Sequence, residues 1–557
     1  MSITQNPAEK LLERARLNAD QPFLYQPVGG QWRSYPWAEV ADQARRMASA
    51  LIGMGLPTGS RVAISGVNTA HWFMADFACG LAGLVGVGLY PKQAESHIQF
   101  ILEHSEAKAL MLGPMPDVDS FLHAVPAGIK LIAMPYPGVP KDKCQYQWDE
   151  LIKANQPIKE PVKRGDDDLW SLIYTSGTTG NPKGVMITAK NLNFAANGML
   201  RDMPSHGEEV FLSYLPLAHA FERGAIELGA LYLGAKVYFL ESLDVLGETL
   251  RYVRPTRFFG VPLVWSRVQG QILKQLPQKK LDRLLRIPII SSLVRAKVKK
   301  ALGMDRCWLR VSGAAALPEA TMAWYHRLGL DIYQGYGMTE NSIYCSVNLP
   351  GANKAGSVGK PYIDSLVRIE GDGTADGEIL NRHDAITPGY FKDEEKTKGI
   401  FTDDGWLKTG DVGHIDSAGY LWITGRVKEI FKTAKGKYVA PAPIEGALAA
   451  NTDIEQLCFV GNGLTQPIML VTLNEDARKK PRLELEQGLR ATMEQVNATL
   501  EPHERIAKIV VAKDEWTIDN GLVTPTMKVK RTIVEKHYHD LLQQQGADRT
   551  AVLAWES

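Results

Sequence analysis

The residues best suited to chemistry lie in a loop rich in Gly, Ser and Thr, YTSGTTGNPKG, from Tyr174 to Gly184. Backbone N–H groups, hydroxyls and the ammonium of Lys183 can all donate to phosphate oxygens. A Walker A loop would need Ser or Thr after the lysine and a helix behind it, but Gly184 and an apolar run follow,. A polar hairpin turn is the structural alternative. The sequence therefore predicts a phosphate-binding loop of another type, or a hairpin.

The chain around this loop alternates between short apolar runs and helical spacing. Four runs are typical of buried strands, at 61–66, 84–90, 108–112 and 129–134. A helix is predicted from Trp37 to near Gly55 and another over 69–83,. Strands that alternate with helices predict βαβ units and a largely parallel sheet. The stretch 135–168, with several prolines and an acidic end, indicates a surface connection.

Length and composition exclude several classes of protein. A chain of 557 residues predicts at least two domains,. With 63 basic and 62 acidic residues the net charge is +1, which gives no general electrostatic basis for binding nucleic acid,. Five scattered cysteines without a CxxC pair argue against a disulfide framework or structural zinc and suit a reducing compartment,. The longest apolar run, 77–91, is shorter than a membrane span, so we expect a soluble, cytoplasmic protein.

Four further motifs follow the loop in order along the chain. They are YQGYGMTE (333–340), KTGD (408–411), GRVKEIFK (425–432) and TPTMKVKR (524–531). With the loop, they resemble the adenylate-forming superfamily of acyl-CoA synthetases, luciferases and peptide-synthetase adenylation domains. The resemblance implies an α/β fold with a large multi-layered N-terminal domain over 1–425. A hinge at 426–428 would then join a small, mobile α+β C-terminal domain at 429–557.

The resemblance also implies how ATP is bound. The β- and γ-phosphates would be held by loop residues, namely Thr175, Ser176, Gly177, Thr178, Thr179, Gly180 and Lys183. The adenine and its surroundings would be contacted by small residues and one aromatic ring, namely Gly313, Ala314, Ala315, Gly335, Tyr336 and Gly337. Thr339 would bind the α-phosphate and Glu340 a magnesium ion, since a carboxylate beside a triphosphate makes sense mainly with a hard cation between them. Asp411 would bind the ribose, and Arg426 the ribose or a phosphate.

The C-terminal motifs imply the remaining roles in such an enzyme. Lys528 matches the family's catalytic lysine and would act with Lys183, Thr339 and Glu340. Met527 stands where many members have glycine, and Lys530 and Arg531 lie close by. Lys428 would be the hinge residue. The basic segment with Lys435, Gly436 and Lys437 would meet CoA, although a solvated basic turn explains the same residues.

Two further motifs bear on the acyl substrate, and the second resembles that of long-chain fatty acyl-CoA synthetases of the bubblegum type. In LPLAHAFER (215–223), His219 would line the acyl and CoA channels, and in RPTRFFGVPLVW (254–265), Trp265 would gate the acyl tunnel. A structural histidine and a core tryptophan are the plainer explanations. The resemblance implies a Mg²⁺-dependent ligase with fatty acid, ATP and CoA as substrates. Alternatives are a CoA ligase for medium-chain or aromatic acids, an acyl-AMP ligase that loads a separate carrier protein, and a catalytically silent nucleotide-binding protein.

Residues 279–300 stand apart from these motifs. Eight basic residues and one acidic residue, Asp282, are interleaved there with Leu, Ile and Val. Cationic and apolar faces together suit peripheral contact with an anionic membrane, such as the inner membrane face. A helix pair with a solvated basic face is the commoner explanation of such a pattern. The oligomeric state has no signature in the sequence.

Overall fold

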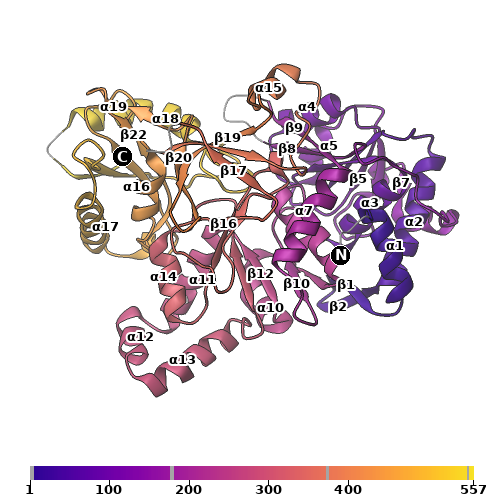
Figure 1. The fold of residues 1–557 in the computed structure, drawn as a ribbon, viewed down its shortest axis with the longest axis horizontal. Coiled ribbons are helices and arrows are strands. Elements are labelled where there is room, and N and C mark those ends of the chain that lie inside the picture. The colour runs from indigo at the N-terminus through magenta and orange to yellow at the C-terminus, as the bar shows by residue number, and fades with distance from the viewer. Residues whose placement is uncertain (1–4, 176–180, 372–375, 549–550, 557) are drawn as a thin grey trace.

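The structure is a computed structural model that describes residues 5–175, 181–371, 376–548 and 551–556. Figure 1 shows the N-terminal half, indigo to magenta, on the right and the C-terminal residues, yellow, on the left. The part coloured orange lies between them. Within the described ranges, no helix combines the length and the apolar character needed to cross a bilayer.

The largest sheet has seven strands in the order β7-β6-β5-β3-β4-β8-β9. Its strands are β3 (Arg61–Ser65), β4 (Val85–Leu89), β5 (Ala109–Leu112), β6 (Lys130–Ala133), β7 (Tyr146–Gln147), β8 (Leu169–Thr175) and β9 (Lys183–Thr188). The first helices of the chain are α1 (Pro7–Leu17), α2 (Trp37–Gly53), α3 (Ala70–Leu81), α4 (Glu95–Ser105), α5 (Val118–His123) and α6 (Trp148–Ala154). All neighbouring strands are parallel except β8 and β9. The predicted βαβ pattern is confirmed.

Two sequence-based expectations are resolved by this sheet. Strands β8 and β9 are antiparallel and Thr175 pairs with Lys183, so the glycine-rich loop connects a β-hairpin. Its residues 176–180 lie outside the described ranges. The expected surface connection over 135–168 is wrong in part, since it contains the edge strand β7 and helix α6, whose Trp148 is fully buried. A two-residue strand carries too few positions to show a periodic pattern.

Two more sheets complete the N-terminal half. One has the order β10-β11-β1-β2 and the other β12-β13-β14-β15-β16. Their strands are β1 (Pro22–Val28), β2 (Gln31–Pro36), β10 (Val210–Ser213), β11 (Lys236–Phe239), β12 (Arg257–Gly260), β13 (Leu309–Ser312), β14 (Tyr333–Tyr336), β15 (Ser346–Val347) and β16 (Lys360–Pro361). The helices of this region are α7 (Ala189–Asp202), α8 (Ala220–Glu222), α9 (Gly229–Leu233), α10 (Leu246–Val253), α11 (Pro262–Gln275), α12 (Gln278–Leu285), α13 (Pro288–Ala301) and α14 (Glu319–Arg327). A π-helix, Arg223–Leu228, joins α8 to α9.

An antiparallel sheet and a short helix follow. The sheet has the order β17-β18-β19-β20, with β17 (Leu366–Ile369), β18 (Gly377–Arg382), β19 (Leu407–Ile415) and β20 (Leu421–Arg426). Helix α15 (Glu394–Gly399) lies between β18 and β19 in the chain. Asp411 of β19 is directly opposite Arg426 of β20. The sheet therefore places two residues of separate motifs next to each other.

The C-terminal part is a small α+β unit with a four-stranded sheet in the order β23-β24-β25-β26. Its elements are β21 (Phe431–Lys432), β22 (Tyr438–Val439), α16 (Pro441–Leu448), β23 (Ile454–Val460), β24 (Ile468–Leu473), α17 (Arg482–Asn497), β25 (Lys508–Val511), α18 (Arg531–His537), α19 (His539–Ala547) and β26 (Leu553–Trp555). Side chains alternate between two cores: Phe459 packs in the cluster of α16 and α17, and Cys458 in that of α18 and α19,.

The apolar clusters divide cleanly along the chain. Four clusters of buried residues contain only positions up to residue 423, and two contain only positions from residue 431 onward. Among the described residues, no cluster combines the two parts. Helix α16 contacts α14 and β20, and ion pairs also join the two parts: Lys92 Nζ lies 2.7 Å from Asp519 Oδ2, and Arg267 Nη2 lies 2.8 Å from Glu455 Oε1. The expected large α/β part and small α+β part are confirmed.

Candidate active site

A buried carboxylate, Asp411, lies where β14 meets the β17–β20 sheet. The Tyr336 hydroxyl donates to Asp411 Oδ2 at 2.6 Å, and Arg426 Nε lies 2.8 Å from Asp411 Oδ1. Burial and the charge of Asp411 raise the pKa of Tyr336 well above its ordinary value, so the hydroxyl keeps the proton that it donates,. An aromatic ring, a carboxylate and a guanidinium are thereby held together by one hydrogen bond and one ion pair,.

A second buried carboxylate, Glu340, belongs to the short 3₁₀ helix Thr339–Asn341. Its Oε1 accepts a hydrogen bond of 2.7 Å from the Tyr390 hydroxyl. The ammonium of Lys183 lies 4.7 Å from the centre of the Tyr390 ring, within the range of a cation–π contact,. Desolvation and the nearby Lys428 charge lower the pKa of Lys183. Tyr390 therefore connects the glycine-rich hairpin to the Glu340 carboxylate.

The backbone after Glu340 is strained. Ser342 and Ile343 have φ values of 53° and 57°, in the left-handed region that favours glycine,. A Cβ atom at Gly337 would lie 2.4 Å from the carbonyl carbon of Ile343, so only glycine fits there. Strain of this kind persists only where the surroundings enforce it, and it concentrates at functional sites.

Lys528 approaches this region from the C-terminal part. Its backbone N–H donates to Thr524 Oγ1 at 3.1 Å, and its carbonyl accepts from the Thr524 N–H at 2.8 Å. The Lys528 side chain is partly exposed to solvent, yet the surrounding protein desolvates its ammonium group. This desolvation, with a smaller effect of the Arg426 charge, lowers the pKa of Lys528 to about 8. Met527 before it has a φ of 63°, in the left-handed region that glycine adopts without strain,.

His219 lies near Lys528 and caps helix α8. Its Nδ1 accepts from the Phe221 N–H at 3.2 Å, so a neutral ring carries its proton on Nε2,. Burial, with a smaller effect of the Lys528 charge, lowers the pKa of His219 to about 3. The imidazole is therefore neutral at physiological pH.

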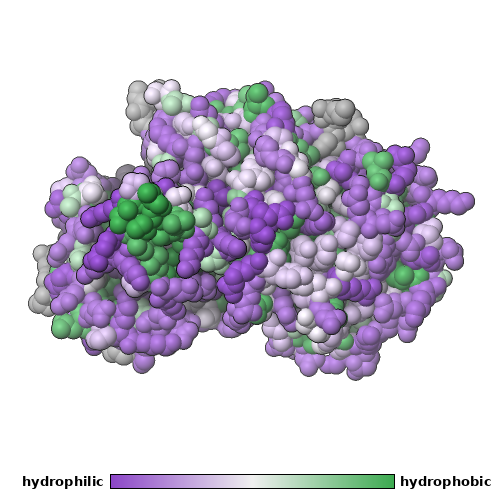
Figure 2. Space-filling view, turned by 90° about the horizontal axis from the view of Figure 1, so that it is seen from below, coloured by the Kyte–Doolittle hydropathy of each residue, from purple (hydrophilic) through white to green (hydrophobic). Residues whose placement is uncertain are grey.

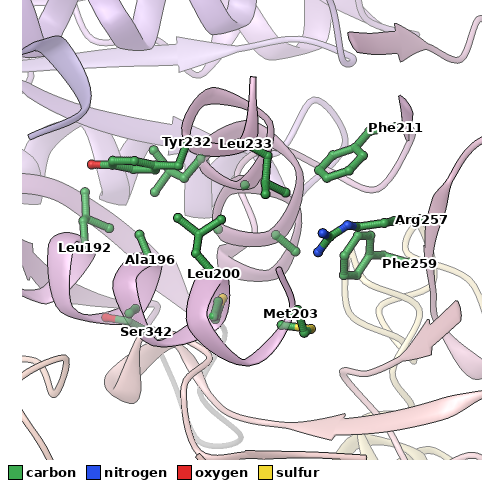
Figure 3. A pocket seen from close by; sticks show the side chains of 16 residues that line it. Leu192, Ala196, Leu200, Met203, Phe211, Tyr232, Leu233, Arg257, Phe259 and Ser342 are labelled. Carbon is green, nitrogen blue, oxygen red and sulfur yellow. The ribbon is translucent and has the colours of Figure 1, made fainter. Parts of the chain in front are cut away.

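Two adjoining apolar pockets extend away from these polar groups. The smaller, about 370 Å³, includes Thr339 in its wall, and the larger, about 610 Å³, lies between α7, the π-helix, α9 and β12. Both share four lining residues: Leu192, Gly224, Leu228 and Ser342. Figure 3 shows the larger pocket with Leu200, Met203 and Phe211 around it.

Arg257 forms one end of the larger pocket (Figure 3). Its Nη2 lies 2.8 Å from Glu209 Oε1 and donates to the Pro204 carbonyl at 3.0 Å. The guanidinium also lies 4.6 Å from the centre of the Trp308 ring. These contacts hold the side chain in place, so this end of the pocket is a fixed wall.

Known families and relatives match almost the whole chain. The family described as AMP-binding enzyme matches residues 11–391, and AMP-binding enzyme C-terminal domain matches residues 428–547. The long-chain-fatty-acid–CoA ligase FadD15 of Mycobacterium bovis is 32% identical, with 96% of each chain covered. The long-chain-fatty-acid–CoA ligase ACSBG2 of Xenopus laevis is 30% identical over 94% of this chain and 81% of its own. The chain belongs to the family of AMP-binding enzymes.

A solved structure agrees on the fold of this AMP-binding enzyme. The adenylation domain of a carboxylic acid reductase from Segniliparus rugosus, in complex with AMP and a co-purified carboxylic acid, superposes with a TM-score of 0.81. It is 22% identical and covers 98% of this chain and 95% of its own. At that identity the likeness supports the fold alone.

The fold of this AMP-binding enzyme places most of the predicted site residues in one region. Lys183, Thr339 and Glu340 lie around Tyr390 and the smaller pocket, while Tyr336, Arg426 and Lys528 lie around the carboxylate of Asp411. Gly313 to Ala315 follow β13, with Gly335 and Gly337 in and after β14, and Ala314 has a φ of 67°. Thr175 ends β8, whereas Ser176, Gly177, Thr178, Thr179 and Gly180 are outside the described residues.

Other predicted residues lie elsewhere. Lys435, Gly436 and Lys437 form the exposed turn of the β21–β22 hairpin, and among the described residues no hydrogen bond or ion pair joins them to Asp411 or Glu340. Trp265 is 0% exposed and packs against Phe258 and Tyr325. It lines neither of the two pockets, so its packing is that of a core residue, and a gating role stays a prediction.

Two features of the AMP-binding enzyme's site were not predicted from its sequence. Tyr390 is far from Glu340 in the chain, and a single tyrosine after Gly389 gives no spacing signal. Arg223 opens the π-helix, pairs with Asp76, donates to the Ser171 hydroxyl and lines the smaller pocket. The charged residues of AFERGAIEL, inside an otherwise apolar stretch, are the signal that could have indicated a buried polar network,.

Proposed function

We propose that the protein is an ATP-dependent ligase that converts a long-chain fatty acid into its CoA thioester. The carboxylate would attack the α-phosphate of ATP, and the bond to pyrophosphate would break, giving acyl-AMP. The CoA thiolate would then attack the acyl carbon, and the bond to AMP would break. The FadD15 and ACSBG2 names of the relatives support this reaction.

The observation that carries the proposal is the pair of adjoining apolar pockets. The smaller pocket reaches Thr339, beside the polar site, and the larger continues between α7 and the π-helix. A fatty acid could place its carboxylate near Thr339 and its alkyl chain among the apolar side chains, where burial of each CH₂ is worth about 0.8 kcal/mol. A small polar acid would leave the larger pocket unused.

The polar residues would divide the work on ATP. Lys183 would bind the terminal phosphates, Asp411 would accept hydrogen bonds from the ribose, and the ammonium of Lys528 would neutralise charge developing on the α-phosphate. Glu340 fits a magnesium site, because it is a buried carboxylate with one oxygen held by Tyr390,. Among the described residues, no three His, Cys, Asp or Glu side chains gather as a metal site, so substrate oxygens would complete the coordination. Bound Mg²⁺ would neutralise phosphate charge.

We also propose that one site serves both half-reactions through rotation of residues 429–557 against residues 1–425, about a hinge at 426–428. With Lys528 beside Asp411, this would be the adenylating arrangement. Rotation would remove Lys528 and bring the exposed Lys435–Lys437 turn toward the phosphates of CoA. Such hinge motions are an established way for a cleft to change its residues.

The proposal is tested by pyrophosphate release with a series of acids from acetate to oleate, with and without CoA. We expect turnover to rise with chain length and to yield acyl-CoA. Acyl-AMP accumulation without thioester formation would instead favour a ligase that loads a carrier protein. Preference for medium-chain or aromatic acids would remove the long-chain assignment, and no pyrophosphate release with any acid would contradict the enzyme assignment.

The rate of adenylation should fall as pH rises through about 8. Lys528 acts as an ammonium ion, and its pKa is lowered to about 8, so its charged form is lost above that pH. For the free enzyme, kcat/KM for ATP should decline by about tenfold per pH unit in the alkaline limit. Arginine stays protonated in this range, so Lys528→Arg should remove the decline. The same alkaline decline in both proteins would assign the titration to another group.

A further inference from the structure

The α12–α13 helix pair projects from the body of the molecule (Figure 1). Its inner face is anchored, because Leu281 is buried in the cluster that contains Trp265 and Tyr325, and Leu285, Val294 and Val298 pack against that cluster. The pair is therefore a fixed part of the surface, and its outer face has a defined composition.

The outer face exposes large apolar side chains at the start of α13. Ile289 is 79% exposed, Leu293 67% and Ile287 45%. Figure 2, seen from below, shows a hydrophobic patch surrounded by hydrophilic residues on the side where the two helices project. Three such residues within seven positions make a continuous apolar surface, which is unusual for a chain that stays fully in water.

Cations accompany the apolar side chains on the two helices, and one of them, Arg295, donates through Nε to the Arg327 carbonyl at 2.9 Å. The only carboxylate in the segment, Asp282, pairs with Arg327 of α14 at 2.5 Å. Among the described residues, the lysines and arginines of the two helices form no ion pair. They are Lys279, Lys280, Arg283, Arg286, Arg295, Lys297, Lys299 and Lys300. The segment therefore keeps a strong positive field next to its apolar surface.

We propose that the α12–α13 pair docks the protein on an anionic lipid membrane. Ile287, Ile289 and Leu293 would enter the boundary between headgroups and acyl chains, and the lysines and arginines would contact lipid phosphates. A second copy of the chain is a poorer occupant, because a symmetric contact would place the same positive surfaces against each other. The anionic membrane matches both the apolar and the charged part of the surface.

This proposal does not depend on the ligase reaction. It is tested by sedimentation of the full chain with phosphatidylcholine vesicles, with and without phosphatidylglycerol, in the absence of fatty acid, ATP and CoA. We expect binding to the anionic vesicles to exceed binding to the neutral ones by at least about tenfold at low salt, and to weaken at high salt. Failure of ligase activity would leave this result unchanged.

A double variant, Ile289→Ser with Leu293→Ser, should lower anionic vesicle binding by about tenfold. Its matched control is Ile363→Ser with Leu483→Ser, whose residues are 74% and 67% exposed and lie outside the helix pair. The control should bind as the unaltered protein does, and both variants should keep its thermal unfolding midpoint, since all four side chains are exposed.

Three results would overturn the proposal. The first is equal sedimentation with anionic and neutral vesicles. The second is an equal loss of binding in the control variant, which would make the effect one of general hydrophobicity. The third is a dimer in solution that Ile289→Ser with Leu293→Ser dissociates while vesicle binding is unchanged, which would assign the surface to a second copy.

Discussion

Replacing Lys528 with alanine should lower the rate of acyl-adenylate formation by about 10²–10³-fold, the usual effect of removing one preorganised group that stabilises transition-state charge. The structure places this ammonium near Arg426 and Asp411, where the α-phosphate would lie between the nucleoside contacts and Lys183. Thioester formation from supplied acyl-adenylate and CoA should continue at nearly the unaltered rate. Single-turnover measurements of each half-reaction separate the two effects.

The neighbouring Lys530→Ala is the control for this prediction. Lys530 lies two residues further along the same segment, so its loss removes one positive charge without removing the group near Asp411. We expect adenylation by Lys530→Ala to stay within about threefold of the unaltered rate. An equal loss of both half-reactions in Lys528→Ala, or a larger loss in Lys530→Ala, would show that the catalytic lysine is assigned wrongly.

Replacing Gly224 with valine should convert a preference for long chains into a preference for short ones. Gly224 lines both pockets, and a Cβ atom there would lie 2.9 Å from Ile343 Cδ1, the end of a flexible side chain. The new side chain would therefore narrow the passage between the pockets with little distortion of the backbone. We expect kcat/KM for palmitate or oleate to fall by about 10²-fold, since each excluded CH₂ loses about 0.8 kcal/mol of burial. Acids short enough to stay in the smaller pocket should be little affected.

Gly270→Val is the matched control for the pocket. Gly270 is a helical glycine in α11 that lines neither pocket, and a Cβ atom there would have no neighbour within 4 Å. Both valine variants should be compared across the same series of acids. Uniform loss for all chain lengths in Gly224→Val would indicate damage to the site, and an unchanged profile would place the alkyl chain outside these pockets.

The sequence was sufficient to predict the helices and strands in which apolar residues recur at a regular spacing. Strands β3 to β6 and helices α2 and α3 were predicted because their apolar spacing extends over several residues. Strand β7 and helix α6 were missed, since two extended residues and one buried tryptophan have no period. The glycine-rich loop was predicted to be a phosphate-binding loop or a hairpin, and its flanking strands are those of a hairpin.

For the candidate site, ordered motifs indicated residues that three-dimensional pairing brings together. Asp411 and Arg426 belong to different motifs, and their contact follows from the register of β19 with β20. Contacts made by a single residue far away in the chain could not be predicted, as with Tyr390 and Glu340. The π-helix and the pockets beside it depend on side-chain packing between distant elements, which apolar spacing alone does not encode.

The separation of the apolar clusters at residues 423 and 431 has a thermodynamic consequence. Since ion pairs such as Arg267–Glu455 join the two parts, and no apolar cluster of the described residues spans them, rotation would transfer little apolar surface into water. The heat-capacity change of the rotation should then be close to zero, because that quantity follows apolar exposure. The balance between the two arrangements would vary little with temperature, and bound nucleotide or CoA would determine it through differential affinity.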